Sequence, residues 1–280
     1  MFTRGCQQAQ SRDVSRLTHY MNSGFASFAS KGRITWSGTH QKLDREAFRL
    51  ISPMIRHDHF PRRKHILNFE GYGGPDGLKV KGQYNSDHLW DPVNEIGHLP
   101  SWIQVHFENL VDCLKREDYI EAGFHAGWMA HYITDSLTPA HHISYKLIAE
   151  EYAEASKLTR RWKTWGSKGW KSSHVAFESG ISTATMFSPL RVKIDMALVE
   201  AVKAHGIEHA IKEESLKIAR LGLYEEFIAH GWTTKLAKSV RATVVPRIPQ
   251  MIAAAWLAAY EAAWTAEPKK SLARAAHANS

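Results

Sequence analysis

Residues 118–134 of the chain, DYIEAGFHAGWMAHYIT, predict a helix at the centre of an all-helical domain. Apolar residues lie on nearly every side of such a helix, which is typical of a helix surrounded by others in a bundle. The preceding residues 101–117 place Ile103, Phe107 and Leu110 on one face, as an amphipathic neighbour would. Further helical patterns cover residues 39–53, 144–158, 174–203, 207–230 and 233–264, the last interrupted by Pro246 and Pro249. No segment shows strand alternation, so the sequence predicts an all-α fold, a single-domain helical bundle.

A loop-rich region is expected over residues 60–100. Its segment FEGYGGPDG, residues 69–77, carries four Gly and one Pro, which favour irregular backbone. A loop of this length in a compact domain is usually functional or disordered, and its His, Asp and Glu residues favour a role beside a metal-site cleft. We further expect residues 1–35 to form a polar N-terminal arm, residues 36–266 the helical domain and residues 267–280 a disordered tail.

The charge and the cysteine content limit the classes of partner and of site. A net charge of +8 favours anionic partners such as phosphate esters, nucleic acid or anionic lipid, although basic surfaces also occur without such a role. With only Cys6 and Cys113 present, a zinc site must use carboxylates and some of the 17 His. No apolar stretch approaches the ~18 residues of a membrane span, so no transmembrane segment is expected. The first 35 residues do not form a standard signal peptide, which leaves the compartment open.

The segment HYITDSLTPAH, residues 131–141, holds three candidate metal ligands. His131 and Asp135 lie four residues apart, so they share one face if the helix continues that far. Pro139 ends the helix, and His141 follows it. Imidazole and carboxylate groups are good zinc ligands, and a carboxylate can bridge two ions. A core His beside a helix-terminal Asp would explain the same spacing without a metal.

Three further elements carry residues of the same chemical types. His174 and Glu178 are four residues apart, His88 lies in the segment DHLWDP, and His40 lies at the start of the first expected helix. Each element alone is more often a core or surface position than a ligand. Four such elements in one chain favour a metal centre.

The run HYITDSLTPAH resembles the run His-Tyr-x-Gly/Thr-Asp-x-x-x-Pro-x-His of the zinc-dependent phospholipase C family, to which the single-strand-specific zinc nucleases are related. The order of the elements is similar as well. An early Trp and His are followed by an acidic loop, a His-x-x-Asp-Pro step, the central run and a His-x-x-x-Glu pair. With a closing amphipathic helix that contains Trp, the resemblance covers about residues 36–264.

The resemblance implies two to three bound Zn²⁺ ions with separate ligand sets. The first ion would be held by His88, His131, Asp135 and a loop carboxylate. For that carboxylate Asp76 is the first choice, and Glu70 and Asp58 are alternatives. The second ion would be held by His141, His174 and Glu178. The third would use His40, with Asp135 as the bridge to the first ion.

The chain also departs from the family pattern at two places. The family completes the third site with the amine and carbonyl of an N-terminal Trp, and the equivalent Trp36 is internal. An internal Trp has no free amine, so this site needs removal of residues 1–35 or another ligand. The gap between His141 and His174 is longer than in the family and carries a basic, Trp-rich insert over residues 159–173. Such a segment can contact bases or a lipid surface, or it can be a solvated helix end.

The function implied by the resemblance is phosphoester hydrolysis of phospholipase C type, in which a metal-activated water cleaves a phosphodiester. Asp76 and Asp135 are the expected catalytic carboxylates, and no Ser or Cys nucleophile is needed. Asp91 is expected to accept a hydrogen bond from a ligand imidazole, or to be a turn residue fixed by Pro92. The expected substrate is a phospholipid or a nucleic acid, and contact with a membrane surface is consistent with the former.

Two alternatives to this function stay open. The first is a single-strand nuclease of related fold, which would use the same chemistry on a different substrate. The second is a non-catalytic helical metal-binding protein, which the internal position of Trp36 keeps open. The sequence does not decide the oligomeric state. Members of the family are commonly exported, and a cytoplasmic location is the alternative.

Overall fold

The computed structural model describes residues 38–71, 73–80, 88–143, 169–186 and 190–264, with the single positions 156, 159, 163, 164 and 166. The expected N-terminal arm, the tail and Trp36 lie outside the described residues, as does almost all of the helix expected over 144–158. Of the basic insert, residues 160–162, 165, 167 and 168 lie outside them as well. The division into arm, domain and tail therefore stays a prediction.

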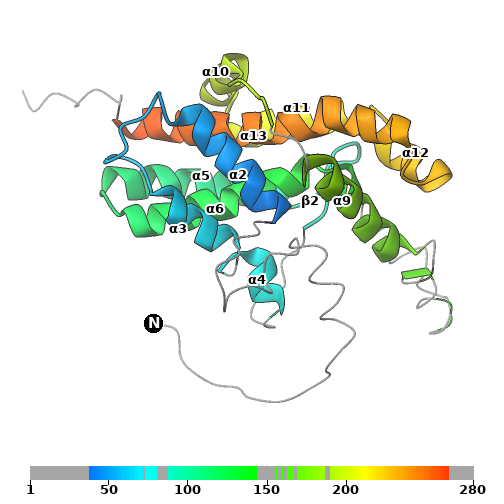
Figure 1. Ribbon diagram of the computed structural model, residues 1–280. Helices are drawn as coiled ribbons and strands as arrows, with labels where there is room; N and C mark the ends of the chain where they lie inside the picture. Colours follow the sequence, from blue (N-terminus) through cyan, green and yellow to red (C-terminus); the bar gives the residue numbers. More distant parts are fainter. Residues whose placement is uncertain are drawn as a thin grey trace, which may run out of the picture.

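The architecture is all-helical, which confirms the predicted fold class. At its centre, α6 (Tyr119–Ser136) packs against α5 (Leu99–Lys115) and α3 (Arg63–Glu70). The long helix α13 (Thr234–Trp264) lies beside α5 and α6. Figure 1 shows α2 and α3 in front of these three helices. The other helical elements among the described residues are α2 (Thr39–Ile51), α4 (Pro75–Val80), η2 (Pro139–His141), α9 (Trp170–Met186), α10 (Met196–His205), α11 (Ile207–Ala219) and α12 (Leu223–His230).

Strand structure in the described part of the chain is confined to one small antiparallel hairpin. It pairs β1 (Trp90–Asp91) with β2 (Ile96–Gly97), and Trp90 lies opposite Gly97. Gly97 has a φ of 121°, a backbone conformation that favours glycine. The hairpin begins two residues after His88 and so fixes the chain on one side of that residue.

The central position of α6 follows from its apolar surface and its first turn. The carboxylate of Asp118 accepts a hydrogen bond from the backbone N–H of Glu121 and caps the helix. Every residue from Ala126 to Ser136 is buried, as expected for a helix surrounded by neighbours. On the side of α13, the buried Trp256 donates its indole N–H to the carbonyl oxygen of Ala126. The helix that carries two candidate ligands is therefore held on several sides.

Two glycines of α6 allow α3 to approach its backbone closely. A Cβ atom placed on Gly127 would lie 2.9 Å from the carbonyl oxygen of Ile66 and 3.2 Å from the backbone nitrogen of Glu70. One turn earlier, a Cβ on Gly123 would lie 3.0 Å from the Cβ of His65. The missing side chains thus bring the end of α3, which carries Glu70, against α6.

Several helix boundaries differ from the sequence-based expectation. The region expected to be loop-rich contains α3 and α4, with Gly71 and Gly74 in the turn between them and Pro75 as the first residue of α4. The expected helix over 174–203 is two helices, α9 and α10, and the expected helix over 207–230 divides at Gly222, where φ is 61°. Conversely, α13 is continuous through Pro246 and Pro249.

Among the described residues, no helix is both long enough and sufficiently apolar to cross a membrane.

The close approach of α3 and α6 leads to a stability prediction. Replacing Gly127 with Ala should reduce the free energy of unfolding by about 1–3 kcal/mol, because the new Cβ meets backbone atoms that have no room to move. This loss should appear even though Ala is favoured over Gly within a helix by about 1 kcal/mol. Urea unfolding followed by circular dichroism measures the change. Gly123→Ala, which meets a side-chain atom instead, should cost less, and equal stability of Gly127→Ala and the wild type would contradict the packing argument.

Candidate metal centre

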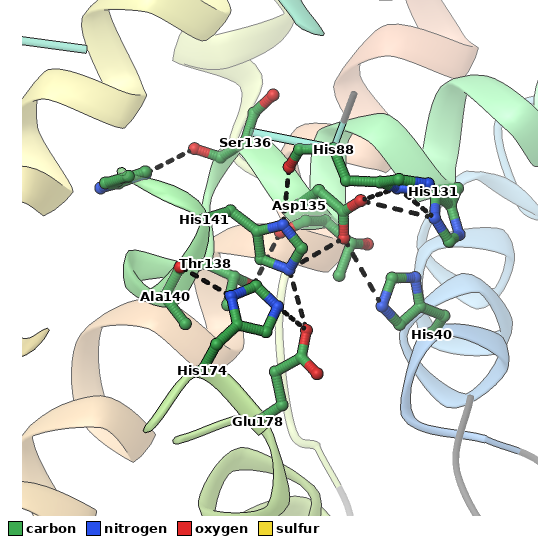
Figure 2. Close-up of polar contacts among 12 residues, drawn as sticks. His40, His88, His131, Asp135, Ser136, Thr138, Ala140, His141, His174 and Glu178 are labelled. Atoms are coloured by element: carbon green, nitrogen blue, oxygen red, sulfur yellow. Dashed lines mark hydrogen bonds and ion pairs between the residues drawn. The ribbon is translucent and has the colours of Figure 1, made fainter. Parts of the chain in front are cut away.

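Asp135 lies in the last turn of α6, and only 2% of its surface is exposed. Four imidazoles surround its carboxylate, as Figure 2 shows. Its Oδ2 atom lies 2.8 Å from Nδ1 of His88 and 3.4 Å from Nε2 of His131. Its Oδ1 atom lies 3.4 Å from Nε2 of His141 and 3.8 Å from Nε2 of His40. Each carboxylate oxygen therefore faces its own pair of rings.

The charges in this cluster stabilise one another. Burial on its own would raise the pKa of the Asp135 carboxyl, because it removes water from the charged form. The neighbouring His141, His131 and His88 outweigh burial and hold this pKa well below its ordinary value. Burial also disfavours the charged form of His131, but Glu70 and Asp135 outweigh that effect and raise its pKa to about 10. The buried carboxylates thus carry negative charge, which the neighbouring protonated imidazoles balance.

The candidate ligands converge from segments that are far apart in the sequence. Because α6 continues to Ser136, His131 and Asp135 share one helix face as predicted. Pro139 then opens the turn η2, which ends at His141. The other candidates come from α2 (His40), the segment before β1 (His88), α4 (Asp76) and α9 (His174 and Glu178).

Three groups of side chains each bring their ligand atoms within 4.8 Å of one another. The first group is Asp76, His88 and His131. The second group is His141, His174 and Glu178. The third group is His40, Glu70 and His131. Asp135 contacts rings from all three groups and so connects them.

The second group is held in one orientation by backbone carbonyls. The Nδ1 atom of His141 lies 2.7 Å from the carbonyl oxygen of His88, and Nδ1 of His174 lies 2.9 Å from that of Ala140. A carbonyl oxygen only accepts hydrogen bonds, so both Nδ1 atoms carry the proton. The two Nε2 atoms then face Oε1 of Glu178 at 2.8 and 3.2 Å. A metal ion held here would replace these contacts and bind the Nε2 lone pairs.

The three candidates for the loop carboxylate of the first group lie at different places in the structure. Asp76 lies in the first turn of α4 and joins His88 and His131. Asp58 pairs with Arg56 at 2.9 Å, has a 66% exposed side chain and belongs to none of the three groups. Glu70 is buried among the ligands, but in the third group. Both Asp76 and Glu70 are therefore at the centre, in different positions.

The residues present fit zinc. Imidazole nitrogens and carboxylate oxygens are its ordinary ligands when no thiolate is available. Within the described part of the chain, Oε2 of Glu178, a member of the second group, is buried and has no hydrogen-bond partner. A buried carboxylate oxygen without a partner is unfavourable, and a bound cation would supply what it lacks.

Asp91 accepts no hydrogen bond from a ligand imidazole among the described residues, so the first of its two expected roles is wrong. Its Oδ1 accepts hydrogen bonds from the backbone N–H groups of Val93 and Asn94, and its Oδ2 accepts one from the Asn94 side chain. These bonds close the turn between β1 and β2, so Asp91 is a turn residue. The backbone acceptors that orient His141 and His174 were missed, since a carbonyl leaves no signal in a sequence.

Comparisons with known proteins support the fold. No family model matches the chain, and no curated protein matches it in sequence. The structure is similar to the crystal structure of Clostridium perfringens alpha-toxin isolated from the avian strain SWCP, with a TM-score of 0.56 and 16% sequence identity. The match covers 84% of this chain and 66% of the toxin chain, so this chain spans slightly less than two thirds of the toxin's length. At this identity the likeness concerns the fold alone.

The buried carboxylate leads to a second stability prediction. Replacing Asp135 with Asn keeps its shape but removes the charge that four imidazoles face. We expect the metal-free protein to lose about 3–5 kcal/mol of unfolding free energy, because the rings then lack their buried counter-charge. Urea unfolding in the presence of a chelator measures this loss. The control Glu200→Gln, in an exposed pair with Lys203, should change stability by at most about 1 kcal/mol, and equal effects of the two substitutions would refute the prediction.

Proposed function

We propose that the protein is a zinc-dependent phosphoester hydrolase of phospholipase C type that cleaves a phosphodiester. The observation that carries this proposal is the buried Asp135 carboxylate, whose two oxygens face different imidazoles within a cluster of zinc-type donors. The all-helical fold, with its likeness to alpha-toxin, supports it. So does the net charge of +8, since phosphodiesters are anionic.

In this proposal the first ion would be held by Asp76, His88, His131 and Asp135, and a second would be held by His141, His174 and Glu178. The contact of Asp135 Oδ1 with His141 and of Oδ2 with His88 supports a bridging position for this carboxylate. A third ion would use His40 and Asp135, with Trp36 as the further ligand if its amine is free. Bound zinc stabilises negative charge on phosphoryl oxygens and lowers the pKa of bound water.

The chain's own residues supply orientation and a proton acceptor. The backbone carbonyls of His88 and Ala140 hold His141 and His174 with their Nε2 atoms toward the centre. The pKa of Asp76 is below its ordinary value, because the neighbouring His131 and His88 outweigh burial, which on its own would raise this pKa. Asp76 is therefore ionised, and its carboxylate can accept a proton from an attacking water. We accordingly propose Asp76 and Asp135 as the catalytic carboxylates.

Metal analysis tests the proposal directly. The purified intact protein should contain about two to three zinc ions per chain, as multi-zinc phosphoesterase sites do. Chelation should abolish hydrolysis of a phosphatidylcholine analogue, and zinc should restore it. His141→Gln removes a proposed zinc ligand and would misplace the metal, so it should lower the activity by at least about 100-fold. The matched control His209→Gln, an exposed histidine on α11, should retain full activity. Fewer than about one zinc ion per chain would exclude this function.

The substrate class needs a separate comparison with the same preparation. Phosphatidylcholine vesicles and a single-stranded oligonucleotide are offered in parallel, with and without chelator. Faster chelator-sensitive cleavage of the vesicle lipid supports the phospholipase reading, and faster cleavage of the oligonucleotide supports the nuclease. Bound zinc without turnover of either substrate favours a non-catalytic metal-binding protein.

The proposed role of Trp36 has its own test. A form that begins at Trp36 has a free amine at that residue, so it should bind one more zinc ion than the intact chain and show higher activity. Zinc analysis and esterase assays of the two forms, side by side, measure both quantities. An intact chain that already holds three ions and is fully active would contradict the role of the amine.

A further inference from the structure

We propose that Glu70 is a positioning residue, which fixes the orientation of His40 and His131 at the metal centre without binding an ion itself. This inference rests on the proposed function, since it assigns a role within the same zinc centre. Glu70 is the last residue of α3, and its side chain is 1% exposed. Its Oε1 atom accepts a hydrogen bond from Nδ1 of His131 at 3.1 Å and lies 2.9 Å from Nδ1 of His40.

The two rings each extend from one carboxylate to another. The Nδ1 atoms of His40 and His131 face Glu70, and their Nε2 atoms face Asp135 at 3.8 and 3.4 Å. A carboxylate oxygen accepts the hydrogen bond from His131, so Glu70 keeps a proton on Nδ1 of that ring. Its contact with Nδ1 of His40 at 2.9 Å is an ion-pair contact without hydrogen-bond geometry. An ion beside Asp135 would displace the proton on Nε2 and bind the lone pair of that atom. A carboxylate that binds the second ring nitrogen of a metal-ligating His is the usual way to fix its tautomer and its orientation.

The same arrangement holds the histidines of the second group. There the Nδ1 atoms of His141 and His174 donate to backbone carbonyls, and their Nε2 atoms converge on Glu178. For His40 and His131, Glu70 occupies the place that a carbonyl occupies for the other two rings. His131, His141 and His174 are thus hydrogen-bonded through Nδ1 and present Nε2 to the interior of the centre. His40 also directs Nε2 toward Asp135, whereas His88 directs Nδ1 there.

The position of Glu70 is set by the packing of α3 on α6. Its backbone nitrogen lies 3.2 Å from where a Cβ of Gly127 would be, and Gly127 is one helical turn before His131. The carboxylate is therefore carried by the end of α3, which packs closely against the helix that holds the ligand. A positioning group needs such support, because it acts by limiting the freedom of the ring.

The substitution Glu70→Gln tests the inference in the intact protein. Gln keeps a carbonyl oxygen that can accept from Nδ1–H, but it lacks the charge. We expect full zinc stoichiometry at saturating zinc and an affinity that is weaker by roughly 10- to 100-fold, as for other partners of metal-ligating His. Competition with a chromogenic chelator gives the affinity. The absorption spectrum of the cobalt-substituted variant should keep the wild-type band positions, since the ligands are unchanged.

A buried glutamate elsewhere in the fold provides the matched control. Glu214 on α11 is 4% exposed and pairs with Arg247 and Lys217. Glu214→Gln removes a buried charge of the same kind, and it should leave both zinc affinity and the cobalt spectrum unchanged. A loss of affinity in both variants would indicate a general structural effect and would overturn the specific role of Glu70.

The remaining outcomes separate this inference from the proposed function. Loss of one ion from Glu70→Gln at saturation, with a changed cobalt spectrum, would make Glu70 a ligand and overturn its positioning role. Unchanged affinity would overturn it as well. A wild-type protein that binds no zinc would instead refute the proposed function. If Glu70→Gln does not fold, Glu70→Asp, which keeps the charge on a shorter side chain, is judged by the same criteria of affinity and stoichiometry.

Discussion

A carboxylate buried at the end of α6 is the constraint on which the rest of the structure depends. Removing Asp135 from water is unfavourable unless cationic or hydrogen-bonding groups replace the lost hydration. The fold meets this requirement with four imidazoles from four parts of the chain, two for each carboxylate oxygen. The elements that deliver these rings must therefore meet at one point, and their mutual packing follows from that requirement.

The helices around α6 serve this convergence in different ways. The glycines at 123 and 127 allow α3 to lie against the backbone of α6, and the indole of Trp256 ties α13 to the same helix. Pro139 ends the helical path soon after Asp135 and opens the turn that presents His141. The hairpin closed by Asp91 fixes the segment that follows His88. Residues that are not candidate ligands thus determine where the candidate ligands lie.

The parts of the site that the sequence predicted are those governed by local geometry. The four-residue spacings of His131 with Asp135 and of His174 with Glu178 place each pair on one helix face, whatever the rest of the fold. The all-helical class followed from periodicity in the same way. The position of Glu70 depends instead on how closely two helices approach, and α3 carries few apolar residues to reveal it as a helix. Backbone carbonyls that orient His141 and His174 are present in every sequence, so only the fold selects them.

The wide separation of the candidate ligands, from His40 on α2 to Glu178 on α9, has a consequence for how the protein matures. The complete centre would be absent from a chain in which α9 has not docked, because His174 and Glu178 lie on α9. Metal binding would then come late in folding. The bound ion would hold together segments that are far apart in the sequence, whose approach in the unfolded chain is entropically unfavourable. Metal binding and the completion of folding would in this way occur in the same step, so that only the fully folded chain would carry the metal centre.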